Sequence, residues 1–463
     1  MDNRISSFLD NVCIHINCKS VHKDIREELT SHITELRDEY LRKGSTEAEA
    51  LDMAIASMGD CDEIGNRLNR QHKPQTEWSI IILTAIIALV GGVIMFISSK
   101  FESLQAVSFE RYLFFAFIGI AVMAALYFFD YTKLKRLALP IYLIALAALI
   151  FTVCTGNVIA GRKYISFIGL SVSSNYATLL LLIAFAGFME KLKNKGGIAI
   201  VYLIGIGGVS LLPIVLLPSL SQALVLLAGY AVLMFSAVMR RHFGGSRRLQ
   251  MFSLGGIAAA GVLALAAVVA SEPHRLHRIA VFITRGRSDS FGSGWQQVMA
   301  DNWLSVSKLF GRTTETISGY GIDMAMPSVT TDYVLINLIA TLGWAAGIAL
   351  IILAALFIIR MLMTARRVKT SYGHYLALAS CTVLSLQFII SILMNFNLFP
   401  LMGMSLPFIS YGGTDYVIDM ALVGVILSVW RRNNLIAAHD KPKGSKSGKF
   451  IVFEDGKLII NFK

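Results

Sequence analysis

Ten apolar segments, each long enough to cross a bilayer, constrain the fold of this 463-residue chain more than any other feature. A transmembrane helix needs about 20 mostly apolar residues. We place such segments at 78–98, 111–129, 137–155, 174–190, 197–217, 220–239, 252–271, 332–358, 374–396 and 411–430. Charged residues make up only 16% of the chain, and hydrophobic residues 55%. The sequence therefore predicts an all-α polytopic membrane protein with about ten transmembrane helices.

Positive charges mark one side of these segments. Alternate short loops are rich in Lys and Arg, whereas the loops between them carry few charges. The basic loops contain Lys133, Lys135, Arg136, Lys191, Lys193, Lys195, Arg240, Arg241, Arg247, Arg248, Arg360, Arg366, Arg367 and Lys369. Because such loops stay on the cytoplasmic side, both termini are predicted to be cytoplasmic, and residues 272–331 form a large extracytoplasmic loop. The net charge of +12 belongs largely to these loops, so membrane lipids and not nucleic acid are the expected partners.

The N-terminal part has a different character. Residues 1–74 predict a small cytoplasmic helical domain, because Ile25, Leu29, Ile33 and Leu36 recur at helical spacing. Such a domain is too small for a deep core of its own, so it is expected to dock on a membrane region or a partner. Its pattern resembles the prefix domains attached to many Firmicute permeases and membrane regulators.

The rest of the chain divides into a membrane part and a tail. Residues 75–432 contain all the predicted spans, and residues 433–463 form a basic cytoplasmic tail. In that tail, apolar residues alternate on both sides of Asp455-Gly456, a dipeptide that favours a two-residue hairpin turn. The tail is therefore predicted to contain a β-hairpin. The spacing of Cys and His along the chain fits no zinc site.

Two short stretches of the membrane part break the helical pattern. Arg162 and Lys163 precede the fourth span, and these adjacent cations could clamp a phosphate or lie at lipid headgroups. Residues 400–413 contain two prolines and three glycines, so they cannot continue a regular helix. Non-helical backbone at membrane depth must be buried in protein or line a wet cavity. This stretch is therefore predicted to shape a site and to add the hydroxyls of Ser410 and Tyr411.

The large loop places a carboxylate among cations and glycines. Asp289 follows Arg285 and Arg287 and precedes a Gly-Ser-Gly-Trp sequence. A carboxylate beside a wet, partly apolar cavity can act as a general base, whereas a lone loop aspartate is more often simply solvated. Beyond it, apolar residues over 294–310 recur near helical spacing and predict a helix on the membrane surface.

Several motifs together resemble one family of membrane proteins. Leu406-Pro-Phe-Ile-Ser-Tyr-Gly-Gly is very close to a signature of the SEDS proteins (shape, elongation, division and sporulation; the FtsW/RodA/SpoVE group). Asp289-Ser-Phe-Gly-Ser-Gly-Trp-Gln is similar to the family's Asp-Pro-Phe-Gly-Ser-Gly-Tyr-Gln. Gly161-Arg-Lys-Tyr-Ile, Pro218-Ser-Leu-Ser-Gln and Pro327-Ser-Val-Thr-Thr-Asp resemble further family motifs in the same order. The resemblance covers the whole membrane part.

The resemblance implies an activity. SEDS proteins are ten-helix membrane enzymes that polymerise lipid II into glycan strands, usually with a class B penicillin-binding protein. The chain is accordingly expected to be a peptidoglycan glycosyltransferase of the bacterial cytoplasmic membrane, acting on lipid II and undecaprenyl-linked glycan in cell division, cell shape or sporulation. By the family match, Asp289 is the expected catalytic base, which deprotonates the sugar hydroxyl of the acceptor while undecaprenyl pyrophosphate leaves.

Further side chains are expected around that reaction. The residues expected to bind substrate, including the cations that stabilise the leaving group, are Arg162, Lys163, Arg285, Arg287, Asp332, Ser410 and Tyr411. The residues expected to shape the site are Gly292, Gly294, Pro407, Gly412 and Gly413. No cofactor and no metal ligands are assigned, although a divalent cation is an alternative to the basic side chains.

Departures from the family pattern leave alternatives open. Ser173-Ser-Asn-Tyr stands for the family's Gln-Pro-Ser-Glu, and Pro218-Ser-Leu-Ser-Gln for its Pro-Asp-Leu-Gly-Thr, so both carboxylates are absent. Conversely, Asp415 and Asp419 stand one helical turn apart, where the family usually has small or apolar residues. A catalytically silent relative that binds lipid-linked precursors or scaffolds cell-wall enzymes is one alternative. A lipid or small-molecule transporter is a second, and it would need polar residues deep in several spans.

Overall fold

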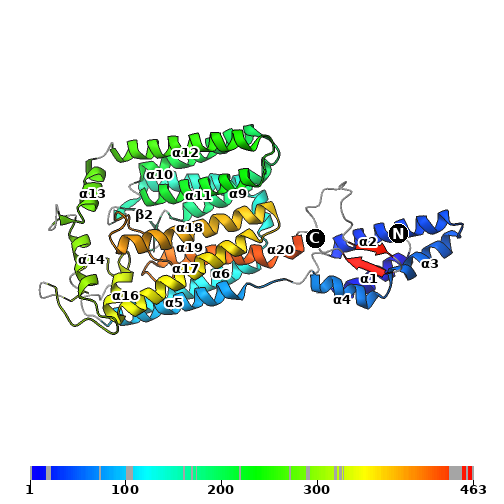
Figure 1. The fold of residues 1–463 in the computed structure, drawn as a ribbon, viewed down its shortest axis with the longest axis horizontal. Coiled ribbons are helices and arrows are strands. Elements are labelled where there is room, and N and C mark those ends of the chain that lie inside the picture. The colour runs from blue at the N-terminus through cyan, green and yellow to red at the C-terminus, as the bar shows by residue number, and fades with distance from the viewer. Residues whose placement is uncertain are drawn as a thin grey trace. The chain divides into compact units, whose positions relative to one another are not determined.

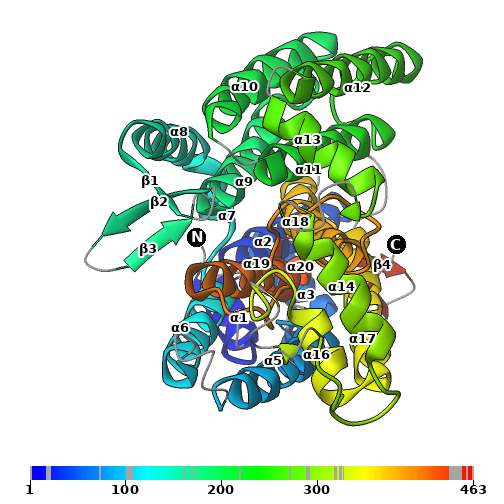
Figure 2. The same ribbon diagram turned by 90° about the vertical axis from the view of Figure 1, so that its left-hand side faces the viewer.

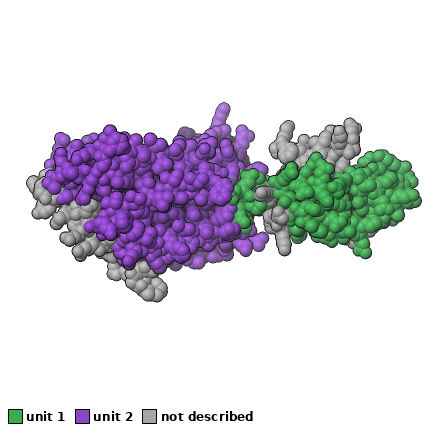
Figure 3. Space-filling view, turned by 90° about the horizontal axis from the view of Figure 1, so that it is seen from below, with its two compact units in different colours: residues 1–76, 431–463 green, residues 77–430 purple. Residues whose placement is uncertain are grey.

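The chain forms two compact units in the computed structural model (Figure 3). Unit 1 combines Met1–Thr76 with Arg431–Lys463, and unit 2 is Glu77–Trp430. The structure describes residues 3–16, 22–71, 74–100, 108–159, 162–167, 170–173, 175–217, 220–270, 273–287, 292, 294–317, 321–322, 326, 328–436, 451–454 and 457–460.

Unit 1 is built from both ends of the chain. Its elements are α1 (Asn3–Ile14), α2 (His22–Arg42), α3 (Glu47–Met58), α4 (Cys61–Gln71), α20 (Asn433–Ile436), β4 (Ile451–Glu454) and β5 (Lys457–Ile460). The apolar face of α2 lies in its core, where Leu29 and Ile33 are fully buried. Leu435 of α20 belongs to the same core, so the chain returns to the N-terminal helices after its last long helix. Strands β4 and β5 pair as an antiparallel hairpin.

Unit 2 consists mainly of long apolar helices that run side by side (Figure 1). Its long helices are α5 (Trp78–Ser98), α6 (Phe109–Phe128), α8 (Ala138–Thr155), α9 (Asn175–Lys191), α10 (Gly197–Leu216), α11 (Leu220–Met239), α12 (Arg247–Ala270), α17 (Trp344–Arg366), α18 (Ser371–Asn395) and α19 (Gly413–Arg431). Within the described residues, eight helices are long and apolar enough to cross a membrane. These eight are α5, α6, α8, α10, α11, α17, α18 and α19, while α9 and α12 occupy the two other predicted spans.

Burial within unit 2 separates a central helix from peripheral ones. Helix α18 contacts α9, α11 and α17, and most of its side chains are buried. Peripheral helices instead expose large apolar side chains, such as Phe117 of α6, Leu216 of α10 and Leu263 of α12. A polytopic helical membrane protein was predicted, and this arrangement confirms it, because lipid can cover apolar side chains that water could not.

The predicted span 332–358 is wrong in one respect, because it is two helices. Helix α16 (Val334–Leu342) ends at Gly343, and α17 begins directly after it. Gly343 has φ +98°, and a Cβ there would lie 2.5 Å from the Leu309 carbonyl oxygen. Only glycine fits this contact. The largely apolar sequence on both sides hid the break, since a continuous apolar run does not mark where one helix ends and the next begins.

Short elements lie across one end of the long helices. Helices α13 (Pro273–Ile283) and α14 (Trp295–Val306) run across that end (Figure 1). A small antiparallel sheet of β1 (Asn157–Ile159), β2 (Arg162–Phe167) and β3 (Leu170–Ser173) lies at the same end, beside α8 (Figure 2). The basic loops, with the short helix α7 (Thr132–Arg136), lie at the opposite end. We refer to these as the α14 end and the basic end.

Candidate functional site

A broken stretch between α18 and α19 enters the core of unit 2. Residues 396–412 are not helical, and Phe408 takes a φ of +64° with its side chain fully buried. Its ring contacts Phe357, Phe388 and Tyr416. On the other side, the backbone of the break packs directly on α5 at Gly91. A Cβ on Gly91 would lie 2.6 Å from the Phe408 carbonyl oxygen. The break is therefore held by packing on several helices, as its prolines and glycines predict.

The predicted site residues of the break have defined contacts. The Ser410 hydroxyl donates to the Thr331 carbonyl at 2.7 Å and accepts from the Leu406 amide at 2.8 Å. Both contacts are to backbone, so this hydroxyl fixes the loop. The Tyr411 amide donates to the Thr330 carbonyl at 2.8 Å, and its buried hydroxyl has no partner among the described residues.

The flanking positions of the break place it between helices. Pro407 is buried. Gly412 accepts the first helical hydrogen bond of α19, from the Tyr416 amide. A Cβ on Gly413 would lie 2.5 Å from the Phe115 ring of α6, so α6 packs directly on the start of α19.

Helix α14 is joined to the break by one asparagine. The Asn397 side chain donates to the Gln297 carbonyl at 2.8 Å and to the Asp301 carboxylate at 2.9 Å. Trp303 and Ala300 of α14 are fully buried against a cluster that includes Ile336 of α16. The helix is shorter than the predicted 294–310, and its buried face differs from the predicted one because Gln297 is buried. This face packs on protein, while the helix as a whole runs across one end of the long helices (Figure 1).

The segment that precedes α14 returns to the end of α13. Gly286, at φ +77°, ends α13 by donating to the Val281 carbonyl at 2.8 Å. A Cβ on Gly286 would lie 2.3 Å from the Gly294 carbonyl oxygen, so these two glycines are in direct contact. Gly294 is the residue at which α14 begins.

The predicted catalytic residue belongs to this segment. Asp289 lies outside the described residues, whereas Gly292 is described as an exposed turn residue. Arg285 and Arg287 are exposed at the end of α13. The structure therefore places Gly286 and Gly294, which flank Asp289 in the sequence, in contact at the α14 end. Arg285 and Arg287 precede Asp289 by four and two residues.

The other predicted cations belong to a different element. Arg162 and Lys163 lie in β2, opposite Ile159 and Val158 of β1, and their side chains are outside the described residues. Figure 2 shows this sheet on the α8 side of the unit, away from α14. The structure thus brings the break together with α14 and with residues 328–333, but not with β2.

Asp332 belongs to the segment that contacts the break. Its carbonyl oxygen accepts from the Asn395 side chain at 2.9 Å, and the Asn395 carboxamide oxygen accepts from the Ile336 amide. The Asp332 side chain itself is half-buried. Asn395 thereby joins α18 to the start of α16, next to the break.

A small cavity of mixed polar and apolar lining lies between α9, α11, α18, α19 and the break. It is lined by Thr178, Leu179, Ser221, Gln222, Val225, Val383, Gln387, Gly403, Met404, Ser405 and Ile418. About 40 Å³ is open to the centres of water molecules, and about 10–15 Å³ suffices for one, so the cavity holds a few. Helices α9 and α11 begin beside it, and helix N-termini favour negative charge.

Sequence reasoning did not single out Gln387 or Thr178. Both are polar residues within predicted spans, and polar residues inside a membrane span are often functional. That signal was present in the sequence. Four separate helices meet at this cavity, however, and only the folded structure shows which polar residues share it.

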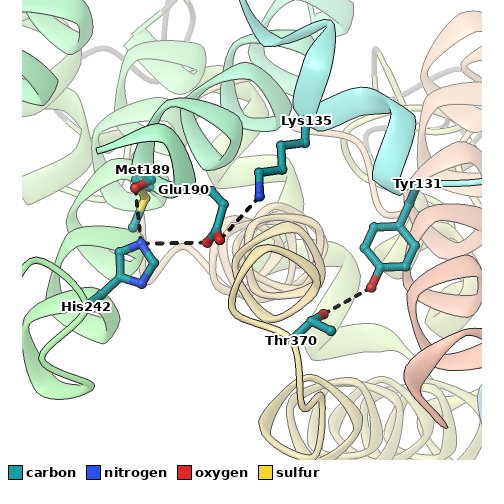
Figure 4. A network of polar contacts seen from close by, with 6 residues as sticks. All are labelled: Tyr131, Lys135, Met189, Glu190, His242 and Thr370. Atoms are coloured by element: carbon teal, nitrogen blue, oxygen red, sulfur yellow. Dashed lines mark hydrogen bonds and ion pairs between the residues drawn. The ribbon is translucent and has the colours of Figure 1, made fainter. Parts of the chain in front are cut away.

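A second polar cluster lies at the basic end (Figure 4). The buried Glu190 carboxylate of α9 lies 3.4 Å from the Lys135 ammonium and 3.7 Å from Nε2 of His242. His242 also hydrogen-bonds the Met189 carbonyl at 3.1 Å. Burial lowers the pKa of His242, while the Met189 carbonyl and the Glu190 carboxylate act in the opposite direction. This cluster joins α7, α9 and the loop after α11.

Unit 2 is thus a polytopic helical membrane unit with a polar, partly non-helical site at one end. The family model FTSW_RODA_SPOVE, described as Cell cycle protein, matches residues 77–435. The chain belongs to this family of integral proteins of the bacterial cytoplasmic membrane.

Curated relatives match over almost their full length. A "Probable peptidoglycan glycosyltransferase FtsW" from Trichlorobacter lovleyi is 23% identical over 372 residues, which cover 76% of this chain and 93% of the relative. The "Stage V sporulation protein E" of Bacillus subtilis is 25% identical, with 78% of this chain and 98% of the relative covered.

Solved structures share the fold. A chain from a study of "polymerization and crosslinking by a peptidoglycan synthase complex" has a TM-score of 0.62 and 22% identity, and the match covers 77% of this chain and 98% of that one. The Thermus thermophilus rod shape determining protein RodA has a TM-score of 0.54 and 22% identity, with 77% and 97% covered.

Proposed function

We propose that the chain is a peptidoglycan glycosyltransferase that polymerises lipid II. Relatives named as probable peptidoglycan glycosyltransferases support this activity. The observation that carries the proposal is the connection between the Asp289 segment and the break. Gly286 contacts Gly294 at the start of α14, and Asn397 joins α14 to the break.

In the proposed reaction, Asp289 is the general base. It takes the proton of the acceptor sugar hydroxyl, whose oxygen forms a bond to the anomeric carbon of the donor. The bond between that carbon and the pyrophosphate oxygen breaks, and undecaprenyl pyrophosphate leaves with the electron pair. A positioned base of this kind contributes roughly 10²–10⁴-fold to a rate.

Positive charge at the α14 end suits the leaving group. Arg285 and Arg287 are exposed beside the Asp289 segment, and guanidinium groups pair well with phosphate oxygens. The N-termini of α9 and α11 add partial positive charge at the cavity. Arg162 and Lys163 of β2 are proposed to bind the lipid-linked pyrophosphate from the α8 side, and a divalent cation carried by the substrate would add to this charge.

The proposed function also implies an orientation in the membrane and a partner protein. We propose that the basic end faces the cytoplasm, because Lys and Arg are retained there, so the α14 end and both substrates lie outside. A class B penicillin-binding protein is the proposed partner, since a structure of similar fold comes from a peptidoglycan synthase complex.

The test is polymerisation by purified full-length protein. Lipid II is supplied with and without a cognate class B penicillin-binding protein, and glycan strands are resolved by gel electrophoresis. We expect strands in at least the complex. Binding of lipid II without any polymer would favour a catalytically silent relative, and lipid movement in proteoliposomes without polymer would favour a transporter.

A further inference from the structure

Residues 191–196 and 240–248 form one platform at the basic end, which we call the loop platform. The first segment runs from the last residue of α9 to α10, and the second runs from the end of α11 into α12. The Gly196 amide donates to the Phe243 carbonyl at 2.7 Å, and the Phe243 side chain is fully buried. The two segments therefore hold each other in place, at the ends of four helices that pack on their neighbours.

The start of α12 is fixed to the same platform. The buried Gln250 side chain donates to the Gly244 carbonyl at 2.5 Å. The Arg247 guanidinium donates to Sδ of Met239, the last residue of α11. Helices α10 and α12 both begin at this platform, so their N-termini add partial positive charge to it. The loop platform is therefore a defined surface on which backbone and side chains carry the same sign of charge.

The cations of the loop platform have no acidic counterpart beside them. The platform carries seven exposed Lys and Arg residues: Lys191, Lys193, Lys195, Arg240, Arg241, Arg247 and Arg248. The one carboxylate between residues 186 and 252 is that of Glu190, which is buried and pairs with Lys135 and His242 (Figure 4). No described ion pair at this end involves the seven cations. Like charges gathered on one fixed surface repel one another, so an anionic ligand stabilises it.

Exposed apolar side chains adjoin the loop platform. Ile198 of α10 and Leu249 and Phe252 of α12 are 59%, 70% and 83% exposed. All three lie within the first two turns of their helices, and α10 and α12 contact each other. A phospholipid that places its phosphate on the cations can lay an acyl chain over these side chains, whereas a soluble anion would leave them uncovered.

We propose that the loop platform binds the headgroup of an anionic phospholipid of the adjoining leaflet, with an acyl chain along α10 and α12. Basic residues at the membrane surface attract anionic lipids, and basic pockets between transmembrane helices bind their headgroups. Guanidinium groups also pair well with phosphate oxygens. This site lies at the opposite end of unit 2 from the candidate functional site, so the inference does not depend on the proposed function.

Native mass spectrometry of the purified, delipidated full-length protein tests the site, with phosphatidylglycerol as the anionic probe and phosphatidylcholine as the neutral one. We expect the wild type to bind phosphatidylglycerol at least about tenfold more tightly. Lys195→Gln/Arg247→Gln should weaken that binding about 25-fold, since each cation near a membrane surface contributes about fivefold, or ~1 kcal/mol. The control Lys133→Gln/Arg366→Gln removes the same charges from other exposed positions of the basic end and should change binding by no more than about twofold.

Three results would overturn the inference. Equal weakening in both double variants would show that lipid is attracted by the total charge of the basic end and not by a site. Equal binding of the two lipids to the wild type would remove the role of charge. Displacement of phosphatidylglycerol by excess soluble glycerol 3-phosphate, which has the phosphate without acyl chains, would identify a soluble anion as the ligand. The last two measurements use the wild type alone, so they decide the inference even if a variant fails to fold.

Discussion

Gly286 is the residue whose backbone most tightly constrains the proposed catalytic segment. It has φ +77° and contacts the Gly294 carbonyl, three residues before and five residues after Asp289. No side chain fits at position 286 in that contact, so the close approach of the two segment ends depends on Gly286 being a glycine. Asp289 was predicted from the motif alone, whereas this contact is visible only in the folded chain.

A matched pair of glycine substitutions tests the contact. Gly286→Ala places a Cβ 2.3 Å from backbone, while Gly311→Ala, at a similar φ of +78°, meets nothing within 4 Å. Left-handed backbone alone costs an alanine about 1–2 kcal/mol, so Gly311→Ala should lower the melting temperature slightly and keep its activity. Gly286→Ala should reduce lipid II polymerisation at least tenfold. Equal activity in both variants would show that the contact does not matter.

The pH dependence of the melting temperature tests the contribution of His242 at the basic end. Burial lowers its pKa in the folded protein, whereas in the unfolded chain it titrates near the ordinary value of about 6.5. As pH falls through that value, the unfolded chain binds a proton that the folded protein resists, so stability present at higher pH is lost. His242→Gln should therefore flatten the fall in melting temperature between about pH 8 and 5.5.

The control for this measurement is a residue that does not titrate. Asn194→Ala, at an exposed position of the same end, should leave the pH dependence as in wild type. If the wild type, His242→Gln and Asn194→Ala curves run parallel, the His242 site does not contribute to acid sensitivity.

At the scale of elements, most spans were predictable because a bilayer-length apolar run is a strong signal. Helix α5 was predicted at its observed bounds, and most other spans shift by only a few residues. The break at Gly343 was not predictable, because apolar residues continue on both sides of it. The buried face of α14 was missed because it includes the polar residue Gln297, whose backbone carbonyl accepts a hydrogen bond from Asn397, 100 residues away.

Substitution of Asn397 tests the connection between α14 and the break, because the Asn397 side chain joins these two elements. Asn397→Ala removes two buried hydrogen bonds, each worth about 0.5–1.5 kcal/mol, with more for the carboxylate. We expect a loss of about 2–3 kcal/mol in stability and reduced polymerisation. Asn194 shares a φ near +60° but is exposed, so Asn194→Ala is the matched control and should retain activity. Similar losses in both variants would assign the effect to backbone strain alone.

At the scale of the whole molecule, the proposed orientation rests on the distribution of charge. The basic loops meet at one end of unit 2 and the candidate site lies at the other, so the proposal places the site on the outer face. In a chain whose native cysteines are replaced, Thr314→Cys in the exposed loop after α14 should react with a membrane-impermeant maleimide in intact cells. A cysteine at Lys193 should react only after lysis. The reverse pattern would invert the topology.

We propose that this membrane protein polymerises lipid II with Asp289 as its base. The most direct measurement is the single-turnover rate of purified wild-type, Asp289→Asn and Glu315→Gln proteins, each with the class B partner. Glu315 is an exposed carboxylate of the same loop, so Glu315→Gln controls for the loss of one charge. We predict that Asp289→Asn lowers the rate by about 10²–10⁴-fold, while Glu315→Gln stays within about twofold of wild type. If Asp289→Asn polymerises lipid II at the wild-type rate, Asp289 is not the base.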